Sequence, residues 1–304
     1  MSAKYLVILN PAAAGGKARP RWARVASHFG PGEVEMLETS RAGHARRLAS
    51  QYAHLHEVVI AAGGDGTIRE VASGLADAGS GVLGILPVGT GNDFAHNFDI
   101  PSDLAGAVDV LFAGYRTACD LGRVDWEENG SQHTDYFANA IGAGFDAQVA
   151  LNVDRFKRLG GLPAYAAAIV RTLFSLRMPE ARVLLDGLEV FAGPLLTGGA
   201  GNGRRLAGGL FITPDAIVND RAFDMWLIRD PAVRRILYLL PSLTRGGHVG
   251  APEVFIERGQ RLVIESPAGL PVQADGDVLA ERAVRIEIEL IPEALTVCAP
   301  LRFG

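Results

Sequence analysis

The segment 56–78 has the pattern of a β-strand, a glycine loop and a helix in direct succession. From Ile68 to Ala76 apolar residues recur at spacings of three and four, so one helix face is suited to pack on a sheet. The loop Gly63-Gly64-Asp65-Gly66-Thr67 therefore falls at the carboxyl end of a strand, where open α/β sheets bind ligands. Glycines let backbone N–H groups approach an anion, and a helix start favours negative charge. The loop predicts a phosphate site.

Asp65 narrows this prediction, because its carboxylate repels a bare phosphate unless a cation lies between them. The residue therefore favours a nucleotide that is bound together with magnesium. The alternative is a glycine-rich turn in which Asp65 caps the helix.

Two further strands run into glycine-rich loops. The apolar run 5–9 ends in Asn10-Pro11-Ala12-Ala13-Ala14-Gly15-Gly16-Lys17, and the run 82–86 ends in Pro87-Val88-Gly89-Thr90-Gly91-Asn92-Asp93-Phe94. Parallel strands place their carboxyl ends at one edge of a sheet, so the three loops predict one nucleotide site. The first loop lacks Walker A spacing, and Lys17 is either a phosphate contact or a solvated lysine at a helix start.

The pattern changes near residue 116. Strand-like runs then dominate, at 116–123, 136–141, 182–185, 188–191, 223–228, 262–265, 272–274 and 285–291, and Asp186-Gly187 predicts a tight hairpin. Helices are predicted at 164–178 and 232–243, the second with Asp230 as N-cap, and an earlier helix is predicted after Pro101 and Ser102 as caps. We therefore predict an α/β plus β fold. A Rossmann-like nucleotide-binding domain spans residues 1–126, and an antiparallel β-sandwich with inserted helices spans residues 127–291.

Composition limits the class of protein. The chain has 304 residues, 48% of them hydrophobic, which suffices for two domains, and its net charge of -5 gives no electrostatic reason to expect nucleic acid. Cys119 and Cys298 lie far apart in sequence and suggest neither a disulfide scaffold nor a zinc site. The first apolar run is too short for a signal peptide, and no window approaches the roughly 20 apolar residues that span a bilayer. We expect a cytoplasmic protein with peripheral membrane contact.

The three loops, together with Gly201-Asn202-Gly203, Gly208-Gly209 and Asp275-Gly276, resemble the diacylglycerol kinase catalytic-domain family. Its bacterial soluble lipid kinases match best, and sphingosine kinases and, more distantly, NAD kinases are related to it. The resemblance covers nearly the whole chain. It implies an active site in the cleft between the two domains, and it implies that residues 292–304 cross back to the first domain.

The resemblance also implies a role for individual residues. Those implied to contact ATP are Asn10, Pro11, Ala12, Ala13, Ala14, Thr39, Gly64, Asp65, Gly66, Thr67, Ile68, Arg69, Glu70, Thr90, Asn92 and Asp93. Those implied to hold Mg²⁺ through water are Asp65, Asn92, Asp93 and Asp120, with a structural magnesium at Asp220. Those implied to act in catalysis are Asp65, Lys17 at the phosphates, Lys157 from the second domain, and Asp275 with Asp277 at the acceptor hydroxyl. For Asp275 the alternative is a residue of a type I′ hairpin turn.

Three positions depart from the family pattern. Asp277 stands where Glu is usual, which shortens the side chain by one methylene, and His96 stands where Arg is usual, which weakens an anion contact at pH 7. Arg221 follows Asn219-Asp220 where Gly is usual, so an ion pair is the alternative to a metal at Asp220.

The sequence thus predicts an ATP- and Mg²⁺-dependent lipid kinase that phosphorylates a diacylglycerol-like or sphingoid hydroxyl. The alternatives are an NAD kinase-like enzyme and a catalytically decayed nucleotide- or lipid-binding module. Basic clusters at 19–24, 41–47 and 155–158 are either solvated helix faces or contacts to anionic lipid, at about 1 kcal/mol per residue. The two apolar helices are expected to pack on the sandwich. The oligomeric state stays open, a homodimer included.

Overall fold

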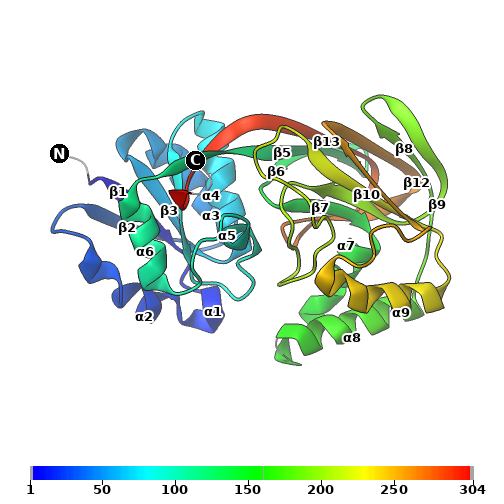
Figure 1. The fold of residues 1–304 in the computed structure, drawn as a ribbon, viewed down its shortest axis with the longest axis horizontal. Coiled ribbons are helices and arrows are strands. Elements are labelled where there is room, and N and C mark those ends of the chain that lie inside the picture. Colours follow the sequence, from blue (N-terminus) through cyan, green and yellow to red (C-terminus); the bar gives the residue numbers. More distant parts are fainter. Residues whose placement is uncertain (1–2, 160, 302–304) are drawn as a thin grey trace. The chain divides into compact units, whose positions relative to one another are not determined.

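The computed structural model describes residues 3–159 and 161–301 and divides into two compact units (Figure 1). The first unit is Met1–Leu121 with Pro292–Gly304, and the second is Gly122–Ile291. Strands and helices alternate in the first unit. Antiparallel strands and the helices α7, α8 and α9 form the second unit, so the predicted α/β plus β fold is confirmed. The long strands β5 (Arg116–Glu128) and β13 (Asp277–Cys298) contribute residues to both units.

A parallel sheet in the order β2-β1-β3-β4-β13 forms the centre of the first unit. Three of its strands are buried along their whole length, as near-continuous apolar runs predict for a sheet covered on both faces. The elements are β1 (Tyr5–Leu9), α1 (Ala13–Gly16), α2 (Ala18–Ala23), η1 (Ala26–His28), β2 (Val34–Glu38), α3 (His44–Tyr52), η2 (Ala53–Leu55), β3 (Val58–Gly63), α4 (Asp65–Ala78), β4 (Val82–Pro87), α5 (Asp93–Asn97) and α6 (Leu104–Ala113).

Helix α4 begins within the central glycine loop, at Asp65. Its N-cap is Gly64, and it ends where Gly79 takes the left-handed conformation, with φ of 64°. The helix α6 is capped by Asp103, whose carboxylate accepts a hydrogen bond from Gly106 N at 2.8 Å. The prediction that Pro101 and Ser102 cap this helix is therefore wrong by one to two residues.

The second unit contains strands in the antiparallel order β11-β10-β9-β7-β12-β13, and β8 pairs with β12 and β9. Asp186 and Gly187, with φ of 48° and 85°, form the predicted hairpin. The elements are β6 (Ser131–Phe137), β7 (Ala140–Gly144), α7 (Phe145–Val153), η3 (Asp154–Leu159), α8 (Gly161–Phe174), β8 (Glu180–Leu185), β9 (Leu188–Gly201), β10 (Phe223–Arg229), α9 (Val233–Ser242), η4 (Leu243–Arg245), β11 (Val254–Gly259) and β12 (Arg261–Ala274).

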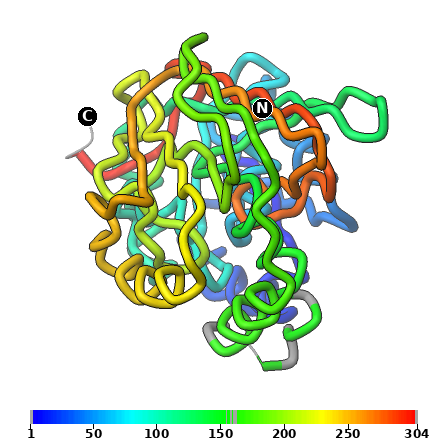
Figure 2. The backbone as a smooth tube through the Cα atoms, turned by 90° about the vertical axis from the view of Figure 1, so that its right-hand side faces the viewer, coloured from blue at the N-terminus to red at the C-terminus, as the bar shows by residue number. Residues whose placement is uncertain are grey.

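Strand β9 continues ten residues beyond its predicted end at residue 191. Glycine weakens strand propensity, and the second half of β9 is rich in it. These small residues permit close packing, since a Cβ on Gly199 would lie 2.1 Å from Ile141 O and 2.5 Å from the Trp226 ring. Helices α8 and α9 lie side by side at one end of this unit (Figure 2). The N-cap of α9 is Ala232, so the predicted cap at Asp230 is wrong.

Candidate functional site

Asn10 joins the first and second glycine loops. It follows β1, and its Nδ2 donates a hydrogen bond to Thr67 Oγ1 at 3.0 Å while its Oδ1 accepts one from Ala12 N at 3.0 Å. Thr67 is buried, and a Cβ on Gly63 would lie 2.3 Å from its hydroxyl oxygen. Only glycine at position 63 leaves room for this hydroxyl. The structure therefore brings the loops 10–17 and 63–67 together.

The third loop is tied to the second by backbone contacts. Gly63 O accepts hydrogen bonds from Val88 N at 3.1 Å and from Gly89 N at 3.0 Å, and a Cβ on Gly89 would lie 2.3 Å from Gly64 Cα. Two glycines facing each other thus let the loops touch. All three loops meet at the carboxyl edge of one parallel sheet.

Asp65 bridges the second and third loops instead of capping its own helix. Its Oδ1 accepts a hydrogen bond from Phe94 N at 3.1 Å, and the N-cap position belongs to Gly64, with no side-chain cap. The structure therefore does not support the alternative in which Asp65 is only a helix cap.

Asn92 places a buried oxygen beside these loops. Its backbone is left-handed, with φ of 52°, and its Nδ2 donates to Gly89 O at 3.2 Å. Its Oδ1 is buried and has no hydrogen-bond partner within residues 3–159 and 161–301. An oxygen in this situation calls for water or a cation, and the buried carboxylate of Asp93 adjoins it in sequence. These oxygen donors suit a hydrated Mg²⁺ held through water. In the described part of the chain no three His, Cys, Asp or Glu side chains cluster closely enough to form a metal centre directly.

Two predicted site residues have anchoring contacts. The Glu70 carboxylate accepts hydrogen bonds from Gly43 N at 2.8 Å and Ala45 N at 2.9 Å, which holds the start of α3. Asp120 is fully buried in β5, and its Oδ1 accepts a hydrogen bond from Glu293 N at 2.8 Å. Asp120 thereby anchors the returning strand β13, whose end pairs in parallel with β4.

The remaining predicted residues of the first unit lie along the loops. Lys17 and Thr90 are exposed, Thr39 N donates to Leu9 O at 2.9 Å, and Ala14 has a left-handed backbone with φ of 53°. His96 is half-buried in the short helix α5. The exposed side chains are positioned to meet a ligand without first breaking a buried contact.

Asp275 lies in the tight turn between β12 and β13. It and Gly276 have φ of 50° and 90°, as in a type I′ turn. Its buried carboxylate accepts three backbone hydrogen bonds, from Ala138 N at 2.8 Å, Asn139 N at 2.9 Å and Ala140 N at 2.8 Å. Asp275 therefore fastens the turn to the corner that precedes β7.

Asp277, two residues on, is exposed. The Gly201-Asn202-Gly203 stretch contacts the same corner, since Asn202 Nδ2 donates to Ala138 O at 2.8 Å and Asn202 N donates to Asn139 O at 2.8 Å. This glycine-rich motif is thus part of the support of the turn.

A series of hydrogen bonds that involve side chains connects α7 with this turn. Asp146, in the first turn of α7, has Oδ1 at 2.6 Å from Thr197 Oγ1, and its Oδ2 accepts from Gln273 Nε2 at 2.9 Å. Gln273 Oε1 in turn accepts from Gly276 N at 2.9 Å. A Cβ on Gly142 would lie 1.8 Å from Asp146 Oδ2, so glycine is required there. Enclosure by protein raises the pKa of Asp146 despite these hydrogen bonds.

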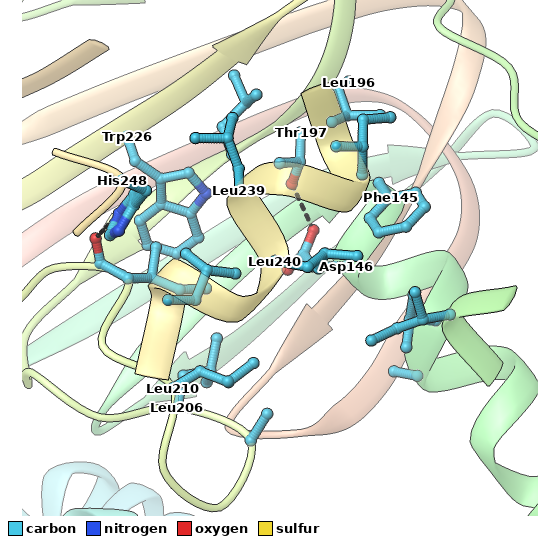
Figure 3. A pocket seen from close by; sticks show the side chains of 18 of the residues that line it. Phe145, Asp146, Leu196, Thr197, Leu206, Leu210, Trp226, Leu239, Leu240 and His248 are labelled. Atoms are coloured by element: carbon cyan, nitrogen blue, oxygen red, sulfur yellow. Dashed lines mark hydrogen bonds between the residues drawn. The ribbon is translucent and has the colours of Figure 1, made fainter. Parts of the chain in front are cut away.

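An apolar pocket adjoins this hydrogen-bonded chain (Figure 3). Helices α7, α8 and α9 with strands β9 and β10 provide most of its wall. Phe145, Trp226 and Leu239 are among its apolar side chains, and Gly276 of the turn also lines it. The pocket therefore extends to the turn that carries Asp275 and Asp277.

Two further predictions concern the second unit. Asp220 pairs with Arg258, and its Oδ1 accepts a hydrogen bond from Ala222 N at 3.3 Å. Its partner is Arg258 and not the neighbouring Arg221. The magnesium at Asp220 stays a prediction. The Lys157 side chain lies outside the described residues.

Sequence reasoning missed Asp146, Gln273 and the pocket. One signal was present: Gly142-Ala143-Gly144-Phe145-Asp146 repeats the order of strand, glycine, aspartate and helix seen at the central loop. The pocket itself has no such signal, because its walls come from segments that are more than 100 residues apart in sequence, from Phe145 to Gly276.

Residues 4–124 match the diacylglycerol kinase catalytic domain, and residues 139–299 match the YegS C-terminal NAD kinase beta sandwich-like domain. A diacylglycerol kinase of Mycobacterium tuberculosis is 32% identical over 275 residues, which cover 90% of this chain and 86% of that protein. A diacylglycerol kinase of Staphylococcus aureus is 30% identical over 248 residues, which cover 81% and 76%.

Solved structures share the fold. A diacylglycerol kinase from Bacillus anthracis has a TM-score of 0.72 at 20% identity, with 99% of this chain and 98% of that chain covered. Yeast NADH kinase in complex with NADH has a TM-score of 0.57 at 11% identity, with 98% and 83% covered. Both likenesses concern the fold alone.

Proposed function

Since this chain belongs to the diacylglycerol kinase catalytic-domain family, we propose that it transfers the γ-phosphoryl group of ATP, with Mg²⁺, to a hydroxyl of a diacylglycerol-like or sphingoid lipid. The observation that carries this proposal is the apolar pocket whose wall includes Gly276. A lipid with its hydrocarbon in this pocket would present its hydroxyl to the turn 275–277.

Support for a nucleotide in the first unit comes from the three joined loops. Asn10 and Thr67 fix the first two loops to each other, and Asp65 fixes the second to the third, so backbone N–H groups are held in place before ATP binds. Asp65, Asn92 and Asp93 are the residues proposed to hold Mg²⁺ through water. When bound, the metal supplies positive charge that offsets the charge of the transferred group.

The two carboxylates of the turn have different roles in this proposal. Asp275 already accepts three N–H hydrogen bonds, which occupy most of its lone pairs, so it positions the turn. Asp277 is exposed and acts as the base. It takes the proton of the acceptor hydroxyl while the hydroxyl oxygen of the lipid bonds to the γ-phosphorus and ADP leaves. This assignment refines the sequence-based expectation that both aspartates act directly on the hydroxyl.

The composition of the pocket wall also favours a lipid over NAD as the acceptor. NAD carries a charged pyrophosphate and polar ribose groups, which need donors and cations around them. The pocket wall is made almost wholly of aliphatic and aromatic side chains, with Asp146, Thr197, Gln273 and His248 as its polar members. Such a wall suits hydrocarbon chains.

Peripheral membrane contact is a further part of the proposal. The helices that wall the pocket also expose apolar side chains on their outer faces, namely Val170 and Phe174 on α8 and Leu237 and Tyr238 on α9. Phe174 is 89% exposed and Tyr238 70%. No helix within the described residues has the length and apolar character needed to cross a bilayer. We therefore propose that α8 and α9 dock on the membrane surface and admit the lipid.

The proposal is tested with γ-³²P-ATP, Mg²⁺ and mixed micelles that contain diacylglycerol, sphingosine or no acceptor, with NAD in a parallel reaction. We expect label in a phosphorylated lipid, dependent on Mg²⁺, and none in NADP. Label in NADP alone would establish the NAD kinase alternative, and ATP binding without any labelled product would establish a binding module.

A further inference from the structure

Gln273 joins the turn 275–277 to the wall of the pocket. Its side chain is buried, and both ends of its amide have partners. Nε2 donates a hydrogen bond to Asp146 Oδ2 at 2.9 Å, and Oε1 accepts one from Gly276 N at 2.9 Å. A backbone N–H only donates, so the amide oxygen must face Gly276 and the amide nitrogen must face Asp146. These contacts therefore fix the orientation of the amide.

The N–H of Gly276 is a group that the turn itself does not use. In a β-turn the closing hydrogen bond joins the first and fourth residues, so the N–H of the third residue is spare. Gly276 is the third residue of the turn 274–277, and it is exposed. A side chain from β12 thus takes the place that water would otherwise have, and it holds the residue next to Asp277.

The other end of this bridge lies on a well-anchored part of the wall. Asp146 is in the first turn of α7, and its Oδ1 lies 2.6 Å from Thr197 Oγ1 on β9 (Figure 3). The four residues Asp146, Thr197, Gln273 and Gly276 all line the pocket. The bridge therefore runs along the pocket wall and ends at the turn.

We propose that Gln273 is a positioning residue, which holds Gly276 so that the neighbouring Asp277 carboxylate keeps one place at the edge of the pocket. This inference rests on the proposed function, in which Asp277 is the base. Asp275 fastens the turn to the 138–140 corner, and Gln273 fastens it to α7, so two successive residues of the turn are anchored. The second anchor matters because a catalytic group displaced by about 1 Å can cost about a hundredfold in rate.

Gln273→Met removes both hydrogen bonds and keeps an unbranched side chain of similar length. We expect kcat to fall about ten- to hundredfold while the KM values for ATP and lipid change by less than about twofold, because the placement of the base is disturbed and binding is not. Ser266→Ala is the matched control. Ser266 is a buried residue of the same strand, its Oγ donates to Glu180 O at 2.8 Å, and it is not among the described residues of the pocket wall. This variant also loses one buried hydrogen bond, and its kcat should stay near the native value.

A pair of variants with reversed polarity tests the bridge itself. At pH 8, Gln273→Glu alone sets two carboxylates against each other and should lower kcat as Gln273→Met does. Adding Asp146→Asn should restore most of the rate, because the asparagine Nδ2 can donate to the glutamate, whose other oxygen accepts from Gly276 N. A double variant that regains the native melting temperature without regaining kcat would overturn the inference.

Backbone dynamics supply a readout that does not depend on turnover. The ¹⁵N relaxation of the Gly276 and Asp277 amides should show a rigid turn in the native protein and in Ser266→Ala, and a mobile turn in Gln273→Met. This pattern supports the inference even if the native protein phosphorylates no lipid, a result that would overturn the proposed function alone. Turn amides that are equally rigid in all three proteins, or a kcat of Gln273→Met equal to the native value, would overturn the inference.

Discussion

The Thr197 hydroxyl oxygen lies 2.6 Å from Asp146 Oδ1 and 3.2 Å from Ala143 O. A hydroxyl has one hydrogen, so it cannot donate to both oxygens. Both contacts are hydrogen bonds if Asp146 is protonated and donates to Thr197, which then donates to Ala143. The raised pKa of the enclosed carboxyl agrees with this arrangement. We infer that Asp146 keeps its proton to a higher pH than an ordinary aspartate.

Asp146→Asn tests the protonated state. Asparagine can donate from Nδ2 to Thr197 and accept from Gln273, so it reproduces the neutral acid. A raised pKa in the folded chain gives stability that is present below the ordinary value of about 3.9 and is lost as pH rises through the folded value. The melting temperature of Asp146→Asn relative to the native protein should therefore increase from pH 4 upward and then level off. Each tenfold difference in proton affinity corresponds to about 1.4 kcal/mol.

The control for this experiment is Asp109→Asn, at an exposed position on α6. Its melting temperature relative to the native protein should change little over the same range. A difference for Asp146→Asn that falls as pH rises would show that Asp146 is ionised in the folded protein.

Thr67 offers a test of how the first two loops are held together. Thr67→Val removes the hydroxyl that accepts from Asn10 and leaves the side-chain volume nearly unchanged. We expect a loss of about 1 kcal/mol in the free energy of unfolding and a five- to tenfold weaker binding of Mg-ATP by calorimetry. Thr67→Ser keeps the hydroxyl and should bind nearly as the native protein does. Equal affinity in all three proteins would mean that this contact does not shape the nucleotide site.

Asp65→Asn separates the structural and ionic parts of this aspartate. The amide oxygen can still accept from Phe94 N, so the melting temperature should change by only a few degrees. The lost negative charge should lower kcat by about 10²–10³ and raise the Mg²⁺ concentration needed for half-maximal rate. Turnover and Mg²⁺ dependence like those of the native protein would remove Asp65 from the proposed metal network.

Asp275 and Asp277 form a matched pair of carboxylates two residues apart. Asp275→Asn places an NH₂ group against a backbone N–H of the 138–140 corner, so we expect a loss of about 1–3 kcal/mol in the free energy of unfolding. Asp277→Asn should lower kcat by about 10²–10⁴ at unchanged melting temperature. The reverse pattern, a stable but inactive Asp275→Asn and an active Asp277→Asn, would make Asp275 the base.

Local patterns in the sequence were enough to predict the three glycine loops. Each loop follows a short, wholly apolar strand, and parallel strands bring such ends to one edge, as Asn10, Thr67 and Asp65 show. The hairpin at Asp186-Gly187 was also predictable from a local pattern, because both residues tolerate the positive φ that its turn requires.

The pocket depended on contacts between distant segments. His248 meets Ile212 and Gln273 meets Asp146 across 36 and 127 residues, and no periodicity records such pairs. The extent of β9 was missed because glycine weakens strand propensity, while Gly199 leaves room for the Trp226 ring, a neighbour that the sequence does not identify. The predicted helix starts were wrong by one or two residues. Helix α6 is capped by the side chain of Asp103, and α9 begins after Ala232 without any side-chain cap, which a search for capping residues does not find.

The outer faces of α8 and α9 supply the last prediction. Phe174 and Tyr238 are exposed at helices that also wall the pocket, and withdrawing such a side chain from water is worth about 1.5–3 kcal/mol. Phe174→Ser with Tyr238→Ser should therefore weaken binding to phosphatidylglycerol-containing vesicles at least tenfold in a sedimentation assay. Leu188→Ser is the matched control, since Leu188 is 74% exposed in the β8–β9 hairpin and does not line the pocket. Equal binding by the double variant and the native protein, or equal loss in Leu188→Ser, would place the membrane contact elsewhere.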